Sequence, residues 1–189
     1  MKGSRGPSPG LWLGMAATAV ILAFARRVRA GDREHELGID LGVSILGISD
    51  KATPDVGAGF GVHYGYGITD QIQLAVNLQY SVLALDVFPS DPPTHPAAMW
   101  NGDVGLEYML DVMRWIPYFG GLVGGYWLQG GTVHREILPG AAIVVGLDYL
   151  VSPRWAVGFE ASEHFLFTDM NLYTSYTTAF ARTEFLWGK

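Results

Sequence analysis

Apolar and polar side chains alternate with a period of two along most of the chain after residue 35. The clearest stretch is 71–82, in which Leu74, Val76 and Leu78 alternate with polar Gln73 and Asn77. A period of two is typical of a β-strand, whose successive side chains point to opposite faces. The same pattern predicts strands over 36–48, 55–67, 71–83, 99–110, 115–128, 140–150, 155–164 and 175–187. In 115–128 both alternating sets are apolar, so the sequence leaves the facing of that strand open.

The links between these strands alternate in length. Short links, rich in turn-forming residues, are predicted at 68–70, 111–114 and 151–154. Longer ones are predicted at 49–54, 84–98, 129–139 and 165–174. Short turns at one rim and longer loops at the other are typical of a transmembrane barrel. The sequence therefore predicts an all-β fold, an eight-stranded antiparallel up-and-down transmembrane β-barrel.

The N-terminal segment predicts export. Lys2 and Arg5 precede an apolar run over 11–25, which is shorter than the ~20 residues of a membrane-spanning helix. A basic start followed by a short apolar run is typical of a secretory signal peptide. We expect residues 1–30 to form this peptide, with cleavage after Ala25 or Ala30, and residues 31–189 to form the barrel. An uncleaved membrane anchor is the alternative.

Composition and charge support a barrel in lipid. Five of the 12 Lys and Arg residues lie in 1–30, which leaves seven against 18 Asp and Glu, a formal net charge of −11 for 31–189. Lys51 and Lys189 are the two remaining lysines, whereas soluble surfaces are rich in lysine. No second apolar run approaches 18 residues, and a closed β-barrel is the other structure that can span lipid. The acidic balance argues against a nucleic-acid partner.

The apolar set of each strand is expected to face lipid, and the polar set, rich in Gly, Ser, Gln and Asn, to fill the interior. A soluble ligand-binding barrel with the opposite facing is the alternative. Counting by two places a polar cluster inside the barrel, namely Asp40, His63, Asp103, Glu107, Asp148, Glu160, Arg182 and Glu184. Buried charges need partners, so Arg182 is predicted within salt-bridge distance of Glu160 or Glu107. The alternative places these charges at a wet rim.

Large side chains are expected to fill the space left by the inward glycines of 55–67, and Trp127 or Phe119 would do so. Other aromatic residues flank the three short turns and predict a girdle at the membrane–water interface. Its members are Tyr66, Tyr108, Trp115, Tyr149 and Trp155. Ordinary aromatic strand propensity is the alternative reading of this pattern.

Four features give the chain a family resemblance. They are the predicted signal peptide, the tight turn from Tyr66 to Ile72, the Pro-Tyr-Phe-Gly-Gly stretch at 117–121 that opens a strand, and the final strand with Phe185 and Trp187 near its end. With these the chain resembles the small outer-membrane β-barrels of Gram-negative bacteria, the OmpA/OmpX-like and OmpW-like group. It departs from their usual aromatic terminus in that Gly188 and Lys189 follow Trp187. The resemblance implies export through the periplasm to the bacterial outer membrane.

The sequence contains no cysteine and no local spacing that predicts a metal, cofactor or catalytic site. Ser162 and His164 lie at one outer rim of the predicted barrel, without an acid to orient the histidine. A structural or interaction role is therefore expected, through loops 84–98, 129–139 and 165–174 that contact lipopolysaccharide or an envelope protein partner. A narrow channel for small or hydrophobic solutes is the alternative, and a lipid-modifying enzyme is the weaker one.

Overall fold

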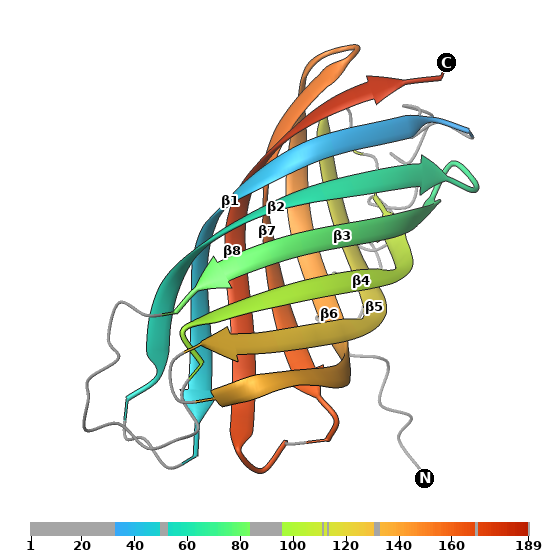
Figure 1. Cartoon of the computed structure of the whole chain (residues 1–189). Coiled ribbons are helices and arrows are strands. Elements are labelled where there is room, and N and C mark those ends of the chain that lie inside the picture. Colours follow the sequence, from blue (N-terminus) through green and yellow to red (C-terminus); the bar gives the residue numbers. More distant parts are fainter. Residues whose placement is uncertain are drawn as a thin grey trace, which may run out of the picture.

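The computed structural model describes residues 33–49, 53–83, 96–110, 112, 114–130, 133–168 and 170–188. Eight strands follow one another along the chain (Figure 1), and their bounds are β1 His35–Ile48, β2 Asp55–Gly67, β3 Ile72–Val82, β4 Ala98–Met109, β5 Trp115–Gly130, β6 Val133–Ser152, β7 Trp155–Leu166 and β8 Tyr173–Trp187. None of the described residues belongs to a helix long and apolar enough to cross a membrane. The predicted signal peptide lies outside the described residues.

The strands close into a barrel in which each strand pairs antiparallel with its neighbours in sequence order. The seam joins β1 to β8, from His35 opposite Trp187 to Ile48 opposite Tyr173. Closure pairs the backbone of every strand on both sides, which is what a sheet needs where water cannot satisfy its N–H and C=O groups. This confirms the predicted eight-stranded up-and-down barrel.

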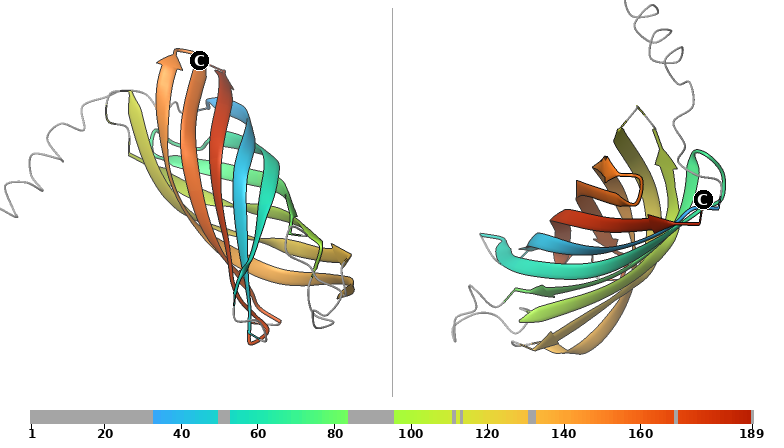
Figure 2. Two further views of the ribbon diagram at one scale, coloured as in Figure 1. Left: turned by 90° about the vertical axis from the view of Figure 1, so that its left-hand side faces the viewer. Right: turned by 90° about the horizontal axis from the view of Figure 1, so that it is seen from above.

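The barrel has two unlike ends. The three short turns, after β2, β4 and β6, lie at the end that also carries the C-terminal end of β8 (Figure 1; Figure 2, left). We call this the short-turn end, and the opposite end, where β1 leaves toward β2, the loop end. The turn after β2 is closed by a backbone hydrogen bond from Ile68 N–H to Ile72 O of 2.8 Å, and Thr69 Oγ1 accepts from the Ile72 N–H.

One predicted loop is wrong. The segment 129–139 is mostly strand, because β5 continues to Gly130 and β6 begins at Val133. The pairs Leu128–Glu136 and Trp127–Ile137 extend the β5–β6 hairpin beyond its neighbours. The predicted loop 165–174 is also shorter, since β7 ends at Leu166 and β8 begins at Tyr173. Most of the predicted loop 84–98 lies outside the described residues, and β4 begins at Ala98.

The facing of the side chains is as the alternation predicts. Val76 and Leu147 are 42% and 40% exposed on the outer wall, whereas their neighbours Asn77 and Asp148 are 4% and 3% exposed inside. The facing of β5, which the sequence leaves open, is settled by the register. Its inward set is Ile116, Tyr118, Leu122, Tyr126 and Leu128, and its outward set includes Trp115, Phe119, Val123 and Trp127.

Large side chains from several strands fill the interior. A loop-end cluster of buried apolar residues closes one half, and consists of Leu46, Ile48, Leu83, Met99, Tyr126, Leu128, Leu138, Leu166, Tyr173 and Tyr176. A second buried cluster lines the wall of β4–β6 and includes Met109, Ile116, Leu122 and Val144. In the loop-end cluster, Tyr126 of β5 and Tyr176 of β8 meet edge to face across the interior, with ring centroids 6.4 Å apart.

The prediction that Trp127 or Phe119 fills the space beside the glycines of β2 is wrong, because both rings lie on the outer wall. Phe180 of β8 occupies that space instead. A Cβ built on Gly59 would lie 2.8 Å from the Phe180 ring, and one built on Gly42 would overlap both that ring and the backbone of Ala179. Glycine at these two positions therefore lets the Phe180 ring pack closely against the inner wall.

Candidate functional site

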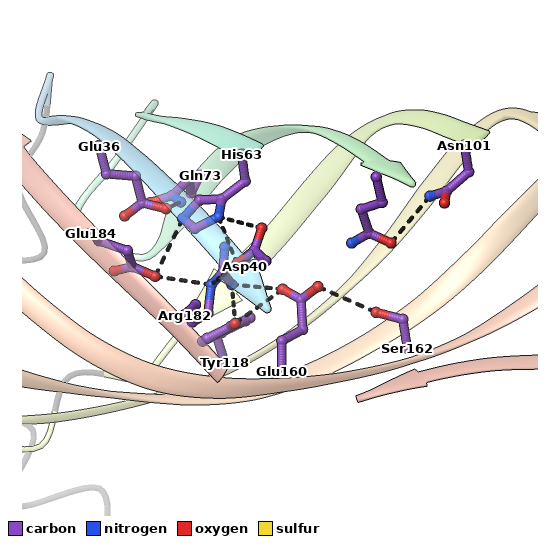
Figure 3. A network of polar contacts seen from close by, with 11 residues as sticks. Glu36, Asp40, His63, Gln73, Asn101, Tyr118, Glu160, Ser162, Arg182 and Glu184 are labelled. Carbon is purple, nitrogen blue, oxygen red and sulfur yellow. Dashed lines mark hydrogen bonds and ion pairs between the residues drawn. The ribbon is translucent and has the colours of Figure 1, made fainter. Parts of the chain in front are cut away.

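The polar residues of the interior gather around Gly38 of β1. The register places Gly38 directly between His63 of β2 and Glu184 of β8, while Glu36 and Asp40 flank it on the same inward face of β1. A Cβ on Gly38 would overlap the His63 ring. The absence of that side chain leaves room for Glu36, Asp40, His63 and Glu184, which come from three strands and converge in the close-up of Figure 3.

His63 is held between carboxylates on both sides of its ring. Nδ1 lies 2.8 Å from Asp40 Oδ2, and Nε2 lies 3.4 Å from Glu184 Oε1 (Figure 3). The first distance is a hydrogen bond, and since an ionised carboxylate only accepts, Nδ1 donates. No described residue gives Nε2 a hydrogen bond, although His63 is 3% exposed. The hydrogen bond to Asp40 therefore fixes the orientation of the imidazole, and Nε2 is left without a hydrogen bond.

Arg182 of β8 connects this group to the opposite wall. Its Nη1 lies 2.6 Å from Glu160 Oε2 of β7, and its Nε lies 3.0 Å from Glu184 Oε1 and 3.5 Å from Asp40 Oδ1. Nη1 also donates to the Tyr118 hydroxyl, and that hydroxyl donates to Glu160 Oε2 at 3.0 Å. The predicted ion pair of Arg182 with Glu160 is confirmed.

The remaining predicted acids lie on other parts of the inner wall. Asp103, Glu107 and Asp148 are all buried, and Asp103 accepts a hydrogen bond of 2.6 Å from the Asn101 amide. Thus all eight residues of the predicted cluster are inside, where the structure brings Asp40, His63, Glu160, Arg182 and Glu184 into direct contact. The idea that these charges sit at a wet rim is not supported, because each is at most 6% exposed.

Sequence reasoning missed three members of the network: Glu36, Gln73 and Tyr118. The Gln73 amide donates to Glu36 Oε1 at 2.5 Å, one pleat nearer the short-turn end than His63. Glu36 shares the strand face of Asp40 and lies four residues before it, so the alternation itself could have identified it. Tyr118 could not be identified in this way because its strand is apolar on both faces.

One group in the described part of the chain has the composition of a metal site. Ligand atoms of Glu36, His63 and Glu184 all lie within 4.8 Å of one another, and all three side chains are buried. Sequence spacing could not indicate this group, because its members come from β1, β2 and β8 and meet only through the register of the closed barrel.

Ser162 and His164 do not form the rim pair that their spacing suggests. Both are buried inside the barrel, at 3% and 2% exposure, rather than at its outer rim. His164 Nδ1 lies 2.9 Å from the Tyr126 hydroxyl and Nε2 lies 3.2 Å from Thr178 Oγ1, whereas Ser162 donates to Glu160. Each side chain thus has hydrogen-bond partners of its own, and Ser162 and His164 do not form a nucleophile with its base.

The predicted girdle residues lie on the outer wall near the short-turn end. Trp115 and Trp155 are exposed there, and Tyr66, Tyr108 and Tyr149 are half-buried. Most contact another ring: the centroids of Trp115 and Tyr149 are 4.8 Å apart, and those of Trp155 and Phe185 are 5.2 Å apart. His35 stacks on Trp187 at the seam, with ring centroids 5.4 Å apart.

A closed barrel with an apolar outer wall, a polar inner wall and aromatic residues at one rim has the architecture of a transmembrane β-barrel. Comparison with solved structures places this fold among the small eight-stranded outer-membrane barrels. Neisserial surface protein A superposes with a TM-score of 0.64 at 14% identity, over 80% of this chain and 96% of that one.

Two further solved structures share the fold. The N-terminal β-barrel domain of Pseudomonas aeruginosa OprF matches with a TM-score of 0.55 at 14% identity, over 80% of this chain and 97% of that one. Ail of Yersinia pestis matches with a TM-score of 0.53 at 10% identity, over 83% and 100%. No protein-family model and no curated protein matches the sequence. The likeness is therefore one of fold.

Proposed function

We propose that this protein is an integral outer-membrane barrel with a structural or interaction role, exerted through its loop end. In this proposal the signal peptide of residues 1–30 directs export through the periplasm, and the barrel of 31–189 inserts with its loops facing outward. The loops then contact lipopolysaccharide or a protein partner of the cell envelope. The fold shared with small outer-membrane barrels and the apolar outer wall support this location.

The filled interior is the observation that carries the proposal. Eight strands enclose a space that side chains can fill completely. Here Leu46, Leu83, Met99 and Leu128 of the loop-end cluster have no exposed surface, and the Arg182 network occupies the other half. Since no apolar layer of this kind hydrates readily, an open water path is not expected, and this favours an interaction role over the alternative of a narrow channel.

The geometry of the interior also disfavours the enzyme alternative. Lipid-modifying chemistry would need a nucleophile or base that faces the membrane or its surface. Ser162 and His164 face the interior and are bonded to separate partners. We therefore infer a non-enzymatic role.

Conductance in planar bilayers, combined with envelope fractionation, tests the proposal. The purified protein should fractionate with the outer membrane and remain silent in the bilayer. A variant with Tyr126→Ala and Phe180→Ala removes two of the largest buried rings and serves as the control that the assay detects openings. Sustained ion-conducting events in the unmodified protein would establish the channel instead. A change in the mass spectrum of lipid A that depends on the protein would establish the enzyme.

A further inference from the structure

We propose that Glu36, His63 and Glu184 bind a divalent transition-metal cation inside the barrel, near its short-turn end. The cation would be coordinated by His63 Nε2 and one carboxylate oxygen from each glutamate. Asp40 would act as a positioning residue behind the histidine. This site lies in the wall of β1, β2 and β8, and it does not depend on what the external loops contact.

The position of the three ligand atoms is the first support. They lie within 4.8 Å of one another. Two ligands at about 2.1 Å from a tetrahedral zinc ion are about 3.4 Å apart. Closing the longest possible separation of 4.8 Å onto an ion therefore takes about 1.4 Å of movement, shared between two side chains, which the side-chain torsions of the glutamates can supply.

The second support is His63 Nε2, which has no hydrogen bond among the described residues. Its Nδ1 donates to Asp40 at 2.8 Å, so its Nε2 is the nitrogen directed toward Glu184. A metal-bound histidine that donates its other N–H to a carboxylate is a recurrent arrangement, because the carboxylate fixes the ring and raises its basicity. Nε2 is buried without a hydrogen bond among the described residues, whereas Glu184 Oε1 has the ion pair with Arg182 Nε at 3.0 Å. A cation between the two residues would give Nε2 a partner and Glu184 a second counter-charge beside Arg182.

The third support is the charge balance. Eight carboxyl groups are buried on the inner wall of the described part of the chain, namely those of Glu36, Asp40, Asp55, Asp103, Glu107, Asp148, Glu160 and Glu184. Arg182 is the one buried Lys or Arg side chain in the described part of the chain, and its charge is shared among Glu160, Glu184 and Asp40. Buried anions without counter-charge are costly, so the remaining negative charge around His63 favours a cation.

The donor set selects the class of metal. One imidazole nitrogen with two carboxylate oxygens suits zinc and similar first-row divalent ions, whereas Ca²⁺ and Mg²⁺ prefer oxygen ligands alone. Three protein ligands leave a coordination position for water. Gly38 provides the room for the group, since a Cβ there would overlap the imidazole.

Zinc binding to the chelator-treated full barrel in detergent tests the site by isothermal titration calorimetry. We expect one zinc ion per chain at a site that His63→Gln and Glu184→Gln each weaken at least tenfold. Asp103→Asn is the matched control, since it removes a buried acid outside the group, and it should leave the affinity unchanged. Circular dichroism and heat-modifiable migration on gels check that each variant is folded. Equal zinc affinity in His63→Gln would overturn the proposal.

A measurement on the unmodified protein guards against variants that fail to fold. In barrel labelled with ¹⁵N-histidine, zinc should move the Nε2 resonance of His63 while Mg²⁺ leaves it in place. The competing account is a protonated histidine held between Asp40 and Glu184 with no metal. If a saturating amount of zinc leaves that resonance unmoved, the competing account holds and the metal site is rejected.

Discussion

Replacing Arg182 by methionine is the most direct test of how the interior is held together. Methionine keeps most of the apolar stem of arginine and removes the guanidinium. The substitution leaves Glu160, Glu184 and Asp40 without the cation that now lies 2.6, 3.0 and 3.5 Å away. The Tyr118 hydroxyl also loses a donor.

The expected loss is large because every partner is buried. Removing one member of a buried ion pair typically costs about 3–5 kcal/mol, since the charge left behind has no compensation. We therefore expect the free energy of unfolding to fall by about 3–5 kcal/mol. Adding Glu160→Gln to Arg182→Met should recover part of this loss, because the amide no longer carries an uncompensated charge.

Urea unfolding in lipid vesicles, followed by tryptophan fluorescence, measures the change. Arg154→Met is the matched control, since Arg154 is exposed at the turn after β6, and its effect should stay within about 0.5 kcal/mol. If Arg182→Met changes the free energy of unfolding no more than Arg154→Met does, the network does not stabilise the barrel and the argument from burial fails.

Three further substitutions test the packing and the facing of the wall. Gly42→Ala should lower the free energy of unfolding by about 1–3 kcal/mol through overpacking against β8, whereas Gly121→Ala, with no atom within 4 Å of its added Cβ, should be neutral in the same urea titration. Val145→Lys on the outer wall should cost about 2–4 kcal/mol in vesicles, whereas Asp70→Lys in the exposed turn after β2 should cost near zero. Equal values would mean that Val145 does not face lipid. Trp155→Ala should cost on the order of 1 kcal/mol through its lost ring contact, and lipids brominated near the headgroup should reduce the tryptophan emission of the parent protein more than that of the variant.

The strands and their facing could be predicted because lipid and a narrow interior impose opposite demands on alternate residues. Val76 and Asn77 differ so clearly in polarity that one strand fixes its own orientation. The orientation of β5 could not be predicted from its own sequence, because Tyr118 and Leu122 inside are as apolar as Phe119 and Val123 outside. Its facing became clear only from the strands paired on either side.

The contacts of the interior could be predicted only in part. Charge pairing alone pointed to Arg182 and Glu160, since a single buried cation has few partners to choose from. The convergence of Glu36, His63 and Glu184 depends on which residues of β2 and β8 lie opposite Gly38, and a register of this kind is not written in local spacing. The extension of β6 to Val133 was missed for a related reason, because Arg135, Glu136 and Pro139 are typical of a loop.

The extension of β6 gives the loop end a paired β-ribbon in place of a loop, which affects how readily proteases can cut it. Residues 133–138 of β6 pair with β5, and the described pairing of β6 with β7 begins only at Gly140. A protease binds its substrate as an extended, unpaired segment, so a paired strand must first open locally before it can be cut. In 136–138 the cross-strand pairs with β5 must therefore open first. With the loop end outward, as proposed above, a protease added to intact cells should therefore cut this paired segment more slowly than an unpaired loop.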